Sequence, residues 1–262
     1  MIQLPVTALL VGALAGDPGA LPLADATATV PRALHASVLD TVDELAKEYD
    51  AAVAAWRQSL REAADAAAKK EIRAAHPVQE YYPRFEELLS GGDLRAAVWM
   101  IANVRYTDLK RSEADAAARK LYAKVLESDL SDARAVREAS ERIVRDRGRV
   151  GEEQAVALLT GAFERAEDRE LKASLAFTTA SLYGKMKGEG NAEKSFAWFE
   201  RVAEEFGDTK VGAQAADQIF VKKHLSVGGT APTFGGTDVD GNELKLEDYR
   251  GKIVVIDFFG FW

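Results

Sequence analysis

The chain has 262 residues, of which 47% are hydrophobic and 29% charged, a balance typical of a folded globular protein rather than a disordered one. Its net charge of −8 repels phosphate groups, which argues against nucleic acid as a partner. Cysteine is absent, which excludes disulfides, thiolate metal sites and cysteine catalysis in the sequence as written. With only three histidines, His35, His76 and His224, we expect no bound metal and no cofactor.

The first 24 residues have the character of a leader followed by a linker. Residues 4–15 form a short apolar run that ends on a small-x-small pattern, Ala13-Leu14-Ala15, as a signal-peptidase site requires. No lysine or arginine precedes this run, and it is too short to span a bilayer. We therefore expect residues 1–24 to be a signal peptide and linker and the protein to be extracytoplasmic, in the periplasm or cell envelope. A mis-assigned start codon or a disordered tail is the alternative.

Residues 25–225 are predicted to form a helical domain without a transmembrane helix. From about Arg32 to Ala75, apolar residues recur at alternating spacings of four and three, which predicts one continuous amphipathic helix that ends before Pro77. The stripe consists of Val42, Ala46, Tyr49, Val53, Trp56, Leu60, Ala63 and Ala67.

Capping residues and glycines then divide the chain into shorter predicted helices. One helix is expected from Pro83 to Leu89 and stops at Gly91-Gly92, and the next is capped by Asp93 and runs through Val104. A third begins at a capping box of Ser112 and Asp115 and ends near Glu127. A fourth is capped by Ser131 and ends near Gly148. Further helices fit residues 151–166, 168–186, 191–206 and 209–224, with Gly207 as the C-cap of the third.

The pair of helices across residues 174–206 resembles a single tetratricopeptide repeat. Tyr183 on the first helix and Ser195, Phe199 and Val202 on the second stand roughly where small and aromatic residues interlock in such hairpins. The length fits one repeat with a glycine-rich insertion at residues 188–190. Since there is one copy and no clean period, an ordinary α-hairpin is the alternative.

Residues 226–262 differ in composition from the helical part. Val239 and Leu244 flank a tight-turn signal, Asp240-Gly241-Asn242, which predicts a β-hairpin. The alternation across residues 244–247 predicts a half-buried strand, and residues 247–250 a short turn. The β-branched run 253–256 predicts a strand buried on both faces of a mainly parallel sheet.

These motifs, in order, resemble the opening of the redoxin branch of thioredoxin-like α/β proteins. That branch includes the TlpA-like and ResA-like thiol–disulfide oxidoreductases and the AhpC/TSA peroxiredoxins. The resemblance covers about one-seventh of the chain. It rests on G-x-x-A-P-x-F, D-x-D-G, L-x-D-Y-R-G-K and D-F-F-G-F-W, carried by Gly228 or Gly229, Ala231, Pro232, Phe234, Asp240, Gly241, Leu246, Tyr249, Gly251, Lys252 and residues 257–262.

The resemblance implies thiol–disulfide exchange or peroxide reduction, with a partner protein or a peroxide as substrate. In the TlpA-like pattern Trp262 directly precedes a C-x-x-C pair, which favours that type over the peroxiredoxins. Asp257 would match the acidic residue that moves a proton to or from the second cysteine. Asp257 and Trp262 thus flank the redox-active position, and the first cysteine would open a helix whose N-terminus stabilises a thiolate.

The sequence as written lacks that cysteine pair, so we expect it to be inactive by itself. Three explanations are open: a partial gene model, a degenerate protein, or a UGA codon that encodes selenocysteine. We also expect residues 226–262 to be poorly ordered or loosely docked on the helices. A function of another class, a helical-repeat scaffold or protein-binding module of the cell envelope, remains as the alternative.

Overall fold

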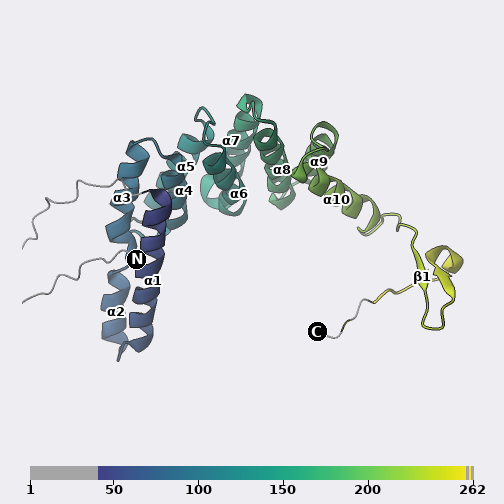
Figure 1. Ribbon diagram of the computed structural model, residues 1–262, viewed down its shortest axis with the longest axis horizontal. Helices are drawn as coiled ribbons and strands as arrows, with labels where there is room; N and C mark the ends of the chain where they lie inside the picture. Colours follow the sequence, from purple (N-terminus) through teal and green to yellow (C-terminus); the bar gives the residue numbers. More distant parts are fainter. Residues whose placement is uncertain (1–40, 258–259, 261–262) are drawn as a thin grey trace, which may run out of the picture. The chain divides into compact units, whose positions relative to one another are not determined.

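A computed structural model describes residues 41–257 and residue 260 of the protein (Figure 1). Within these residues the chain is mainly α-helical and carries a small two-stranded antiparallel sheet near its C-terminal end. The mainly helical fold is therefore confirmed, while the thioredoxin-like and tetratricopeptide assignments remain predictions. Residues 1–24 lie outside the described part, as does the start of the first predicted helix. No described helix is both long and apolar enough to cross a membrane.

The helices follow one another closely along the chain, and most pack against the next in sequence (Figure 1). Their bounds are α1 Val42–Glu62, α2 Ala66–Ala74, α3 Val78–Ser90, α4 Leu94–Asn103, η1 Val104–Tyr106, α5 Arg111–Leu126, α6 Ala133–Val150, α7 Glu152–Arg165, α8 Arg169–Lys185, α9 Asn191–Glu205 and α10 Lys210–His224. The last four match the helices that the sequence predicts for residues 151–224.

The first predicted helix is in fact two, so the expectation of one continuous helix was wrong. Ala63 adopts an extended backbone (φ −60°, ψ 127°) and ends α1. Asp65 then caps α2, because its carboxylate accepts a hydrogen bond from the N–H of Ala68 at 2.8 Å. The indole of Trp56 donates to the carbonyl of Ile72 at 2.6 Å. The apolar stripe therefore folds back on itself, and α2 packs on α1.

Helix α3 begins five residues earlier than predicted, at Val78 instead of Pro83. The N–H groups of Gln79 and Glu80 donate to the carbonyls of His76 and Pro77, which closes the first turn. Pro83 lies inside the helix. Proline favours the first turn of a helix, but here the turn before Pro83 is already helical.

Two predicted caps are each displaced by a neighbouring acid. At α5, Glu113 accepts a hydrogen bond from the N–H of Lys110 at 3.0 Å, so the expected pairing of Ser112 with Asp115 does not start the helix. At α6, Asp132 accepts from the N–H of the third helical residue at 3.0 Å and takes the place predicted for Ser131. The helix also continues past Gly148 to its end at Val150.

One core cluster takes residues from α1 and from α3 through α10, whereas α2 contributes no buried residue. In the first helices it is aromatic: Phe85 is fully buried and stacks on Trp99 with ring centroids 3.6 Å apart, and Tyr49 meets the same indole edge-on at 4.8 Å. The tightest pair of helices is α8 with α9, followed by α9 with α10.

Small residues allow α8 and α9 to approach closely. Ser195 is buried and donates from its hydroxyl to the carbonyl of Ala180 at 2.8 Å. A Cβ on Gly184 would lie 3.1 Å from the same hydroxyl oxygen. Phe177 and Phe199 meet edge-on at 5.2 Å. The predicted hairpin is therefore present. Its C-cap is Phe206 and not the predicted Gly207, which follows it without a positive φ.

The predicted β-hairpin near the C-terminal end is confirmed. Strand β1, Gly235–Thr237, pairs antiparallel with β2, Glu243–Lys245, and Gly236 stands opposite Leu244. The 3-10 helix η2, Leu246–Tyr249, follows and fulfils the predicted turn.

Two strand predictions in this segment were wrong. The half-buried strand expected over residues 244–247 ends at Lys245, and all of β2 is exposed. Residues 253–256 form no strand, and Ile253 and Val255 are 98% and 88% exposed. A strand needs a hydrogen-bonded neighbour, and no described segment offers one to this run.

Candidate functional site

The structure describes only one of the two residues that flank the predicted redox-active position. Asp257 is exposed and belongs to no helix or strand, and Trp262 lies outside the described residues. The proton-transfer role foreseen for Asp257 calls for burial beside the run 253–256, which is exposed among the described residues, so this role stays a prediction. Within the described residues no cluster of histidine, aspartate and glutamate could hold a metal ion.

The turn that joins β1 and β2 is a self-contained hydrogen-bonded unit. The carboxylate of Asp238 accepts from the N–H groups of Asp240 and Asn242 and from the side-chain amide of Asn242. Hydrogen bonds from the Asn242 side chain and backbone lower the pKa of Asp238. Gly241 sits at φ 85°, a conformation that suits glycine. In the D-x-D-G motif it is therefore the first aspartate that holds the turn, a residue that the sequence motifs alone did not single out.

A structured joint connects α10 to this segment. The Nδ1 atom of His224 lies 3.0 Å from the carbonyl oxygen of Thr230, and the hydroxyl of Ser226 donates to the carbonyl of Val221 at 3.2 Å. A Cβ on Gly229 would come within 2.7 Å of the carbonyl oxygen of Lys223. Glycine is therefore required here for a close backbone approach, and the G-x-x-A-P motif begins at this joint.

A groove that the sequence analysis did not foresee lies between α8, α9 and α10. Its volume is about 340 Å³. Lys222 is its one charged lining residue, and its walls are apolar and aromatic. The lining residues that matter here are Tyr183, Met186, Ala192, Phe196, Phe199, Gln218, Val221 and Lys222. Of these residues Val221, near the end of α10, is 45% exposed, an unusual exposure for an apolar side chain that only the structure shows.

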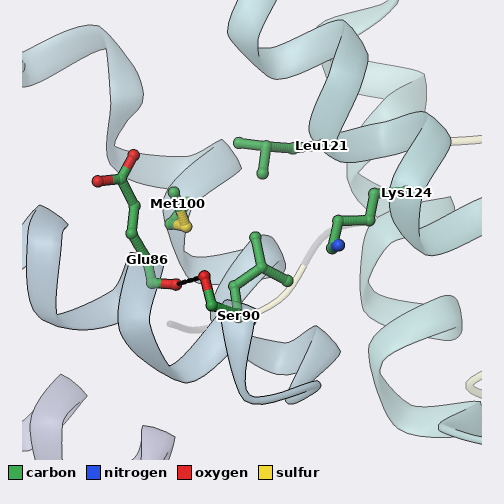
Figure 2. A pocket seen from close by; sticks show the side chains of 6 residues that line it. Glu86, Ser90, Met100, Leu121 and Lys124 are labelled. Atoms are coloured by element: carbon green, nitrogen blue, oxygen red, sulfur yellow. Dashed lines mark hydrogen bonds between the residues drawn. The ribbon is translucent and has the colours of Figure 1, made fainter.

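A second hollow of about 390 Å³ lies between α3, α4 and α5 (Figure 2). Met100 and Leu121 are its buried apolar residues. The hydroxyl of Ser90 donates to the backbone carbonyl of Glu86 at 2.8 Å, so this group is already engaged. Figure 2 shows the carboxylate of Glu86 directed away from Lys124. The hollow therefore presents no paired acid and base.

The most strongly perturbed titratable group serves packing. Tyr122 donates from its hydroxyl to the carboxylate of Asp146 at 2.8 Å, and burial followed by the charge of Asp146 raises the pKa of Tyr122. Arg149 pairs with Asp115 at 3.0 Å and lies 3.7 Å from Asp146. This network joins α5 to α6 and opens into neither of the two hollows.

His76 lies between two aromatic rings where α2 gives way to α3. Its ring meets Trp56 edge-on at 4.6 Å and stacks on Tyr106 at 5.2 Å. Its Nδ1 accepts a hydrogen bond from the N–H of Val78 at 3.2 Å. Burial, and then the charge of Arg57, lower the pKa of His76, which favours the neutral ring that this hydrogen bond requires.

Comparison with known proteins gives one short likeness. No family model matches the chain, and no solved structure does. The thiol–disulfide oxidoreductase ResA of Geobacillus kaustophilus is 51% identical over 41 residues, 16% of this chain and 24% of that protein. ResA of Geobacillus thermodenitrificans is 49% identical over the same length, and that of Bacillus thuringiensis subsp. konkukian 36% over 53 residues, 20% of this chain and 31% of that protein. The chain thus spans 24–31% of the length of these relatives. At that coarse level the likeness supports a relationship to thioredoxin-like redoxins.

Proposed function

We propose that this protein is a thiol–disulfide oxidoreductase of the thioredoxin-like redoxin family, with a helical domain (residues 25–225) ahead of the redoxin. The observation that carries the proposal is the likeness to ResA, which we assign to the C-terminal segment because the redoxin motifs lie there. The hairpin between β1 and β2 supports this assignment, since it forms from the same residues.

The proposed chemistry is dithiol–disulfide exchange. The thiolate of the first cysteine in the family pattern attacks a partner's disulfide, forms a mixed disulfide and releases the partner's other sulfur as a thiolate, which takes up a proton. The second cysteine loses its proton and attacks the mixed disulfide, so the pair becomes oxidised and the partner is reduced. Asp257 is the proposed acceptor of the second cysteine's proton. The family pattern places this pair directly after Trp262, and cysteine or selenocysteine at the first position satisfies the proposal.

A chimera tests whether residues 226–262 act as the opening of a redoxin. We would join residues 1–262 to Geobacillus kaustophilus ResA from its first redox cysteine onward and measure the reduction of insulin disulfides. We expect turnover, because the segment supplies the hairpin and the central strand that the ResA fragment lacks. Val254→Asp should abolish it by placing a charge in the proposed strand, whereas Lys245→Glu on the exposed hairpin should not. An inactive chimera, or one indifferent to Val254→Asp, would contradict the proposal.

A protein-binding role for the helical domain is a second candidate. The groove between α8, α9 and α10 favours it, because it is apolar and open beside the joint to the redoxin segment. The proposed extracytoplasmic location rests on residues 4–15, and N-terminal sequencing of the native protein tests it through cleavage after Ala15.

A further inference from the structure

The walls of the groove suit side chains of an extended peptide. Tyr183 comes from α8 and Met186 directly follows that helix, while Phe196 and Phe199 come from α9 and Val221 from α10. Gly184 and Ala192 also line the groove, and their lack of large side chains leaves space along that part of the wall. A volume of about 340 Å³ is at the lower end of the range of ligand pockets, roughly 300–1,000 Å³. It therefore has room for a few side chains and not for a folded domain.

The polar groups of the groove favour an acidic ligand. Neither the ammonium group of Lys222 nor the amide of Gln218 forms a hydrogen bond or ion pair with another residue in the described part of the chain. By contrast, Lys223 pairs with Glu200 at 3.3 Å, and the hydroxyl of Ser195 is engaged with α8. Lys222 thus supplies an uncompensated positive charge, and Gln218 can donate to or accept from a peptide group.

The groove adjoins the start of the proposed redoxin. Ser226 lines the groove and also opens the C-terminal segment. Eight residues, 227–234, separate it from β1, and those up to Thr230 belong to the joint that is fixed against the end of α10. A polypeptide held in the groove would therefore be presented to the redoxin at high effective concentration.

We propose that the groove between α8, α9 and α10 binds an extended segment of a partner polypeptide in which carboxylates alternate with aromatic or aliphatic side chains. Lys222 binds a carboxylate, and the aromatic walls take the neighbouring apolar side chains. This inference rests on the proposed function, since the partner is the protein whose disulfide is exchanged.

Fluorescence anisotropy with the full chain tests the proposal. The probe is a short fluorescein-labelled synthetic peptide in which aspartates alternate with phenylalanines and leucines, and its twin carries lysines in place of the aspartates. We expect saturable binding of the acidic peptide and weak binding of its twin. Lys222→Glu should lower the affinity for the acidic peptide about tenfold and raise the affinity for its lysine-containing twin. Ala192→Trp, which fills the groove from an exposed position, should abolish binding of the acidic peptide.

Lys210→Glu is the matched control, because it makes the same charge change at the other end of α10, outside the groove lining. It should leave binding of the acidic peptide within twofold of the unmodified chain, as roughly 18 Å of helix separates the two lysines. The proposal is overturned if the acidic peptide does not bind at about 1 mM. It is also overturned if Lys222→Glu has no effect or Lys210→Glu has an equal one. The assay reads binding and not thiol chemistry, so its failure and that of the chimera are distinguishable.

Discussion

Asn242 is tied to the carboxylate of Asp238 by two hydrogen bonds, one from its backbone N–H at 2.8 Å and one from its side-chain amide at 3.0 Å. The backbone N–H of Asp238 in turn donates to the carbonyl of Asn242 at 2.9 Å. The two residues that bracket the turn therefore close the hairpin through their own side chains. The opening of the proposed redoxin can thus take up its local structure without burial of its apolar residues.

The hairpin should open in acid. The pKa of Asp238 is lowered from 3.8 in the folded state, so the carboxylate stabilises the hairpin above that value and the stabilisation is lost as the pH falls through the folded-state pKa. The amide resonance of Gly241, followed by NMR from about pH 6 to about pH 2, should move towards its random-coil position. Asp238→Ala should show the open position already at neutral pH. The control is Asp240→Asn, because the Asp240 side chain accepts no hydrogen bond from the described residues, and this variant should behave as the unmodified chain. Equal effects of Asp238→Ala and Asp240→Asn would refute the role of the Asp238 carboxylate in the hairpin.

His76 should make the helical domain less stable in mild acid. Because its pKa is lower in the folded than in the unfolded state, the unfolded chain binds more protons, and stability falls as the pH drops below about 6.5. The protonated ring also loses the acceptor that binds the N–H of Val78. The melting temperature should therefore decrease between about pH 7.5 and pH 5.5. His76→Phe should remove most of this decrease, whereas His224→Gln should not; an unchanged pH dependence in His76→Phe would disprove the role.

Gly184 and Ser195 should show coupled effects on stability. Gly184→Ala alone should gain about 1 kcal/mol of stability from helix propensity. This gain is opposed by steric repulsion, because the new Cβ would lie only 3.1 Å from the Ser195 hydroxyl oxygen. Ser195→Ala removes that oxygen and a hydrogen bond, at a cost of about 1 kcal/mol. In the Ser195→Ala background, Gly184→Ala should therefore stabilise by about 1 kcal/mol. Urea unfolding of the four proteins measures this, and strict additivity would show that the contact has no energetic effect.

The buried link between Tyr122 and Asp146 should matter more than surface ion pairs. Tyr122→Phe removes a hydrogen bond to a carboxylate and should cost about 1–2 kcal/mol in urea unfolding. Asp146→Ala should cost about 3 kcal/mol, since it also leaves Arg142 and Arg149 without their shared acid. Glu138→Ala breaks an exposed pair with Arg134 and should cost less than about 0.5 kcal/mol. Similar costs for all three would contradict this ranking.

Periodicity in the sequence identified the helices well but not where they begin. The last four helices were predicted almost to the residue, because glycines and caps separate them clearly. The break at Ala63 was missed because the apolar stripe continues through it. The cap at Asp65 was overlooked, and the hydrogen bond from Trp56 to the carbonyl of Ile72 then holds α2 against α1. The caps of α5 and α6 were assigned to the wrong residue because adjacent serines and acids are equally good acceptors.

The site was less predictable than the fold. The tight-turn signal gave the hairpin, whose geometry is local. Residues 253–256 carry a strong strand signal, yet a strand also requires a hydrogen-bonded neighbour that the sequence pattern alone cannot supply. The groove around Lys222 was not foreseen, because residues from three helices form it. The sequence also does not tell which of the neighbouring lysines is paired, and only the structure shows that Lys223 binds Glu200 while Lys222 faces the groove.

The most direct test of the proposed function is the mass of the native protein after thiol alkylation. We would purify it from its own organism, treat it with iodoacetamide with and without prior reduction, and map the peptide that contains Trp262. The account predicts that this peptide continues into two alkylatable residues in a C-x-x-C or selenocysteine-x-x-Cys arrangement, and that both become modified only after reduction. A native protein that carries no thiol or selenol beyond Trp262 would contradict it.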